Sequence, residues 1–261
     1  MDNNVIYALI LTILAGLTTG IGSIIGLFVP RENKTFLSAA LGFSAGVMLY
    51  VSFIEMFPKS QEYLSDYFGQ SIGIWWVSGA FFLGMILIML IDNFIPSPES
   101  DLTAQKSGQH SATLERMGLL TALAIAIHNF PEGLATFAST LDDVSLGVAI
   151  AVAIAIHNIP EGIVTSVPIY HATGKKKKAF IVSLLSGLTE PLGAVIGYLI
   201  LSPFLNDALY GIIFAAIAGI MVYISIEELI PMAREYDKGN SMISGCIVGM
   251  MIMALSLILL M

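Results

Sequence analysis

The chain has 261 residues, of which 56% are hydrophobic and only 11% are charged, and its mean hydropathy is +0.86. A soluble domain usually carries about 25% charged residues, so this composition excludes an ordinary soluble domain and indicates an integral membrane protein. The formal net charge of −8 argues against nucleic acid as a partner. Cys246 is the single cysteine, which excludes a disulfide framework and a thiolate metal cage.

Eight apolar stretches are long enough to cross a membrane, because a span needs about 20 mostly apolar residues. The first lacks a basic leader and a clear cleavage site, so we interpret it as a span and not a signal peptide. The sequence therefore predicts an all-α integral membrane protein, with one transmembrane domain over residues 1–261. The spans lie near 5–29, 36–57, 72–92, 117–139, 145–170, 179–201, 208–230 and 241–260.

The basic residues predict the orientation of these spans. Ten of the 11 Lys and Arg residues fall in one alternate set of connections, and only Lys59 lies in the other set. Basic loops stay in the cytoplasm, so we expect both termini to face outward, in the cell (inner) membrane. The run Lys175–Lys178 then anchors the inner surface, where membrane lipids with anionic headgroups are suitable partners.

The longest connection, about 94–116, is rich in Pro and Ser and has no apolar periodicity. It predicts a flexible cytoplasmic loop. All other connections are short, which makes successive helices run antiparallel. Glycines recur at four-residue spacing, for example Gly42 with Gly46 and Gly245 with Gly249, and such faces let membrane helices pack closely.

Two almost identical motifs occupy the fourth and fifth spans. Residues 124–133 read A-I-A-I-H-N-F-P-E-G and residues 153–162 read A-I-A-I-H-N-I-P-E-G, so nine of ten positions agree. Each copy places His, Asn and Glu where a membrane tolerates few polar groups, and an ionisable residue inside a span indicates a functional site. These residues are His128, Asn129 and Glu132 in the first copy, and His157, Asn158 and Glu161 in the second.

The spacing within each motif favours metal binding. The His and the Glu are four residues apart, so they share one helix face, with the Asn one step round. Imidazole, carboxamide and carboxylate together suit a divalent first-row metal. Pro131 and Pro160 leave the carbonyls four residues earlier without their helical donors.

Glu190 adds a third helix to this arrangement. Counted along the predicted helices, His128, His157 and Glu190 all lie about 15–18 Å from the nearest end of their spans, near the membrane midplane. Each glutamate at that depth costs about 2.5–3.5 kcal/mol on insertion scales, and a bound dication would offset this cost. The sequence therefore predicts a metal site between helices 4, 5 and 6. A buried polar network that only holds the helices together is the alternative.

Other acidic residues lie at other depths. Glu55, with Ser52 one turn earlier, falls near the outer rim and is a candidate entrance. His171 and Asp92 fall near the inner rim, together with Glu227 and Glu228, and either of the first two is a candidate exit. The alternative for all of them is that they are ordinary interfacial residues.

The paired motifs resemble those of the ZIP family of divalent-metal transporters, and the chain is similar to the bacterial ZupT-type branch. The resemblance covers nearly the whole chain, including 44–49, 186–193 and 218–223. It implies eight helices with outward termini and uptake of metal into the cytoplasm. Many family members have a long His-rich loop between helices 3 and 4, whereas this chain has only His110 there.

The resemblance also implies a binuclear centre. Its primary ligands would be His128, Glu132, His157 and Glu161. Asn129, Asn158 and the two motif glutamates would hold a second ion, and Glu190 would complete the centre. The expected cargo is Zn²⁺, with breadth toward Fe²⁺, Mn²⁺, Co²⁺ and Cd²⁺, and no catalytic cofactor is expected.

Two other functions are alternatives at this point. An intramembrane metalloenzyme would use the same carboxylate and His groups, but the chain has no H-E-x-x-H motif. A metal-sensing receptor would need a soluble output domain, which the spans leave no room for. Carrier or channel action, proton coupling and a homodimer all stay open at this point.

Overall fold

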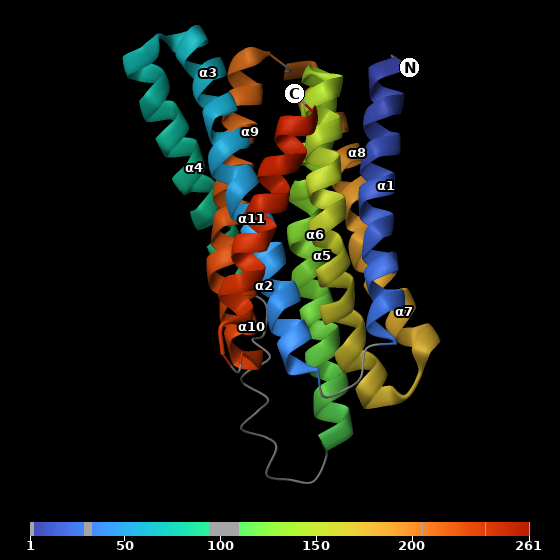
Figure 1. Cartoon of the computed structure of the whole chain (residues 1–261). Coiled ribbons are helices and arrows are strands. Elements are labelled where there is room, and N and C mark those ends of the chain that lie inside the picture. The colour runs from blue at the N-terminus through green and yellow to red at the C-terminus, as the bar shows by residue number, and fades with distance from the viewer. Residues whose placement is uncertain (1–2, 29–32, 94–109, 205, 238, 261) are drawn as a thin grey trace.

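The structure is a computed structural model that describes the whole chain except residues 1–2, 29–32, 94–109, 205, 238 and 261, and except the side chains of 110–118, 121, 171 and 260. Within the described residues there are only helices, turns and short connections, which confirms the predicted helical membrane fold. The long helices run side by side as a bundle, with the N- and C-terminal ends of the chain at the same end (Figure 1).

The helices of the structure correspond closely to the predicted spans. They are α1 (Asn3–Gly26), α2 (Lys34–Val51), the π-helix η1 (Ser52–Met56), α3 (Phe57–Phe68), α4 (Gln70–Asp92), α5 (His110–Asp142), α6 (Val144–Thr173), α7 (Lys176–Gly187), α8 (Thr189–Leu201), the 3₁₀-helix η3 (Ser202–Phe204), α9 (Asp207–Ile224), the π-helix η4 (Ser225–Leu229), α10 (Ile230–Tyr236) and α11 (Ser241–Leu260).

Several boundaries differ from the sequence prediction. The second span continues through η1 to Phe68 and the seventh continues through η4 to Tyr236. The sixth is interrupted at Leu188, between α7 and α8. Residues 110–116 were expected in the long loop but are helical, because Ala, Leu, Glu and Arg in that stretch favour a helix without apolar periodicity. The rest of that loop, 94–109, lies outside the described residues.

The surface of the bundle is apolar, as a lipid environment requires. Trp75 is 80% exposed on α4 and Leu259 is 74% exposed on α11, and such side chains would be costly in water over so wide an area. Among the described residues, seven helical stretches are long and apolar enough to cross a membrane. The protein is therefore a multi-pass membrane protein.

The helices pack as two groups that meet along α6 and α5. In one group α1, α5, α6, α7 and α8 contact one another, and in the other α2, α3, α4, α9, α10 and α11 do so. The groups meet where α2 packs on α6 and α9 packs on α5. Glycines allow the closest crossings, since a Cβ at Gly22 would lie 1.9 Å from the carbonyl oxygen of Ile159.

Candidate metal centre

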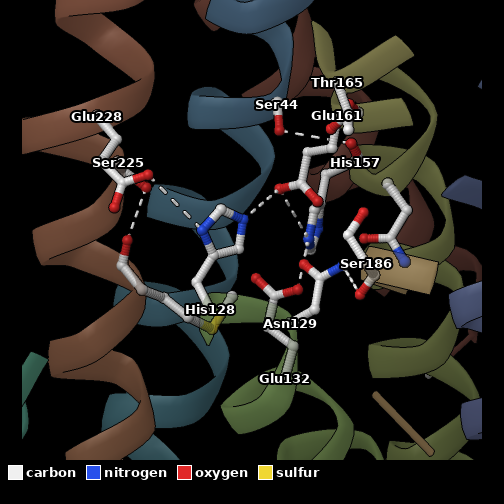
Figure 2. Close-up of polar contacts among 12 residues, drawn as sticks. Ser44, His128, Asn129, Glu132, His157, Glu161, Thr165, Ser186, Ser225 and Glu228 are labelled. Carbon is white, nitrogen blue, oxygen red and sulfur yellow. Dashed lines mark hydrogen bonds and ion pairs between the residues drawn. The ribbon is translucent and has the colours of Figure 1, made fainter. Parts of the chain in front are cut away.

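The two motifs face each other across the α5–α6 interface. Nε2 of His128 lies 3.2 Å from Oε1 of Glu161, and Nε2 of His157 lies 3.2 Å from Oε2 of Glu132 (Figure 2). Each His therefore approaches the glutamate of the other helix most closely. Oε1 of Glu161 also lies 3.9 Å from Nε2 of His157, which joins the two pairs into one cluster.

These side chains are almost completely enclosed by protein. His157, Glu132 and Glu161 are 0% exposed and His128 is 1% exposed. One ligand atom from each of Glu132, His157 and Glu161 fits within a group in which all distances are at most 4.8 Å. Buried carboxylates beside imidazoles suit a divalent cation, because isolated buried charges are strongly disfavoured.

The asparagines and Glu190 form an adjoining layer. Nδ2 of Asn158 donates hydrogen bonds to a carboxylate oxygen of Glu190 and, over 3.0 Å, to the carbonyl of Ala15. Nδ2 of Asn129 donates to the carbonyl of Ser186 over 3.2 Å. Glu190 reaches this position because it lies in the first turn of α8, just after the interruption at Leu188.

Five buried oxygens of the cluster and the adjoining layer accept no hydrogen bond from any described residue. Both asparagines use their amide nitrogens as donors, which leaves their carbonyl oxygens free. A buried acceptor without a partner costs about 1–3 kcal/mol, so five together require compensation by a cation or by protons. The oxygens are Oδ1 of Asn129, Oε1 of Glu132, Oδ1 of Asn158, Oε2 of Glu161 and Oε2 of Glu190.

Glu228 lies beside the centre, although the sequence analysis placed it at the inner rim. Its Oε2 is 3.8 Å from Nδ1 of His128, on the side of the ring away from Glu161 (Figure 2). The predicted span ended near residue 230, whereas the helix continues through η4 to Tyr236, so Glu228 does not lie at the end of the span. Pro231, three residues later, was the available signal of irregular backbone.

Three of the candidate entrance and exit residues have described contacts, and these contacts are with residues outside the paired motifs. Glu55 lines a pocket of about 180 Å³ together with Lys59 and Asp143, whereas Ser52 is buried and its hydroxyl donates to the carbonyl of Met48. Asp92 ends α4 and accepts a hydrogen bond of 3.4 Å from the hydroxyl of Tyr223. The side chain of His171 lies outside the described residues.

Comparison of the sequence with known proteins places this chain in a family. The sequence profile described as "ZIP Zinc transporter" matches residues 3–116 and 96–257. A protein named "Zinc transporter ZupT" from Streptococcus mutans is 56% identical over 99% of both chains. Proteins with the same name from Lysinibacillus sphaericus and Oceanobacillus iheyensis are 53% and 55% identical, over 100% and 99% of both chains.

The predicted resemblance is thereby confirmed over the full length of the chain. Because the matched family is one of transporters, the alternative of an intramembrane metalloenzyme is not favoured, and the protein is not an enzyme. The chain, with its paired His-Asn-Glu motifs facing each other inside a helical bundle, belongs to the ZIP family.

Proposed function

We propose that this protein carries Zn²⁺ across the cell membrane into the cytoplasm. The observation that carries the proposal is the buried cluster of two imidazoles and three carboxylates between α5, α6 and α8. A bound cation would stabilise the negative charge that such a cluster carries at membrane depth. The names of the relatives in three bacteria support zinc as this cargo.

The centre holds two ions in this proposal. Glu132 directs Oε2 toward His157 and leaves Oε1 without a partner, and Glu161 directs Oε1 toward both histidines and leaves Oε2 without one. Each glutamate can therefore bridge a first ion beside the imidazoles and a second ion beside the asparagine oxygens. Donors of this mixed kind also suit Fe²⁺, Mn²⁺, Co²⁺ and Cd²⁺, so we propose that the protein transports these metals too.

Uptake of radiolabelled zinc into proteoliposomes tests the proposed function. The purified protein should raise zinc uptake well above that of empty vesicles, and an excess of unlabelled Fe²⁺, Mn²⁺, Co²⁺ or Cd²⁺ should compete. A protein in which both His128 and His157 are alanine is the matched control, and its uptake should fall to the level of empty vesicles. Equal uptake by the wild type and this control would contradict the proposal.

The asparagines should affect the second ion more than the first. We expect Asn129→Ala and Asn158→Ala to bind one ion where the wild type binds two, because each loses a buried amide oxygen that no described residue hydrogen-bonds and that the proposal assigns to the second ion. Transport should be altered in rate or metal preference, not abolished. Native mass spectrometry measures the stoichiometry. If both variants keep two ions and normal flux, or if the wild type never holds more than one, a single site should replace the proposed pair.

We also propose eight spans with both termini outside, of which seven are the stretches found among the described residues and the eighth is α5. In a Cys246→Ala background, a cysteine at Val144, an exposed residue at the start of α6, should react with an impermeant thiol reagent in intact cells. A cysteine at Lys177, an exposed residue near the start of α7, should react only after permeabilisation. The reverse labelling pattern would refute the orientation.

A further inference from the structure

Two stretches of the chain outside the paired motifs repeat each other. Residues 45–63 and 218–236 agree at nine of nineteen positions. The pairs are Ala45 with Ala218, Gly46 with Gly219, Met48 with Met221, Tyr50 with Tyr223, Ser52 with Ser225, Glu55 with Glu228, Pro58 with Pro231, Glu62 with Glu235 and Tyr63 with Tyr236. Glu228, which lies beside the centre, therefore has a counterpart in Glu55.

Both copies adopt the same irregular backbone. Each contains a five-residue π-helix, η1 or η4, that begins at the repeated serine. In each the serine hydroxyl donates to the carbonyl of the repeated methionine four residues earlier, over 2.7 Å at Ser52 and 2.8 Å at Ser225. The two copies run in opposite directions, since α3 lies at the end of the bundle where the termini lie and α10 lies at the other end (Figure 1).

The paired motifs are related in the same way, because each motif can take the place of the other. His128 with Glu161 and His157 with Glu132 are reciprocal contacts of equal length, so α5 and α6 are equivalent at the centre. The repeated helices pack accordingly, because α9 contacts α5 and α2 contacts α6. In this arrangement α5 corresponds to α6 and α9 corresponds to α2, while the chain direction is reversed. Such an arrangement is an inverted repeat, which transporters commonly use to open one site to either side of the membrane.

One contact breaks this equivalence. Nδ1 of His128 lies 3.8 Å from the carboxylate of Glu228. Neither Nδ1 has a hydrogen-bond partner among the described residues, but Nδ1 of His128 is within ion-pair distance of this carboxylate, and the ion pairs described for His157 involve its Nε2. The carboxylate that the repeat would supply at Nδ1 of His157 belongs to Glu55, which instead lines the pocket with Lys59.

We propose that Glu55 and Glu228 are alternating positioning residues for the two histidines. Glu228 supports His128 in the state seen here, and Glu55 takes the same place at Nδ1 of His157 when the centre opens toward the end that carries the chain termini. A metal-ligating His usually donates its second ring N–H to a carboxylate, which fixes the ring and strengthens the ligand. Each state then strengthens a different His, so the ion is held by a different imidazole on each side. This inference rests on the proposed transport function.

The test measures KM for zinc separately from each face of vesicles that hold the protein in one orientation. Glu55→Gln should raise KM by about 10- to 100-fold for zinc presented at the face of the termini and leave KM at the other face near the wild-type value. Glu228→Gln should give the mirror result. Glu62→Gln is the matched control, because Glu62 lies two turns beyond Glu55, pairs with Lys59 and also has a repeat counterpart.

Equilibrium zinc binding by purified Glu55→Gln shows whether a change in KM comes from misfolding of the variant. The variant should hold as many ions as the wild type, since the contacts described for Glu55 are with residues outside the paired motifs. A Glu55→Gln protein whose KM matches Glu62→Gln at both faces, or rises equally at both, would overturn the inference. A wild-type protein that moves no zinc from either face would instead overturn the proposed function, and the inference with it.

Discussion

Glu132→Ala and Glu161→Ala should each lower zinc uptake by more than about 100-fold, since even groups that only support a metal ligand usually contribute about 10- to 100-fold. Each of these glutamates has one oxygen facing a His and another that is buried without a hydrogen-bond partner. Its removal therefore damages both proposed ion positions at once, whereas loss of one histidine removes a ligand of the first ion only.

The measurement combines uptake in proteoliposomes with ion counting by native mass spectrometry. Neither alanine variant should retain two ions. Glu132→Gln and Glu161→Gln are the matched controls, because the amide keeps the shape and one carbonyl oxygen but cannot hold a negative charge between two ions. A Glu132→Ala protein with two ions and normal uptake would show that the glutamates do not bridge the centre.

The sequence predicted six residues of the centre because their information is local. Two copies of one ten-residue motif, with His and Glu four residues apart, can only present those groups on one face of a helix. Depth counting also brought Glu190 to the right level. The structure confirms the helical membrane fold and places these residues together, while their role as metal ligands stays a prediction.

The contacts that the sequence did not predict depend on how separate helices pack against one another. It did not anticipate that His128 lies closest to Glu161 of the other helix and not to Glu132 of its own. It also placed Glu228 too far from the centre, because the apolar pattern ends near residue 230 while the helix continues to Tyr236. The repeat that links Glu228 to Glu55 was visible in the sequence, but its copies are 173 residues apart and only half identical.

Close packing between α5 and α8 places Glu190, and a single methyl group should disrupt it. A Cβ at Gly133 would lie 1.9 Å from the backbone carbonyl oxygen of Glu190. Backbone cannot rotate away as a flexible side chain can, so α8 must shift. The hydroxyl of Thr189 also donates to the carbonyl of Ala126 over 2.8 Å, and the same shift would break this second link between the helices.

We therefore expect Gly133→Ala to lower the thermal midpoint of the purified protein, to lose the second ion and to abolish most uptake, with overpacking alone costing about 1–3 kcal/mol. Gly79→Ala is the matched control, since Gly79 lies within α4 and a Cβ there meets no atom within 4 Å. Alanine favours a helix over glycine by about 1 kcal/mol, so this control should be as stable as the wild type or more so. If Gly133→Ala were as stable and as active as Gly79→Ala, the position of Glu190 could not depend on this crossing.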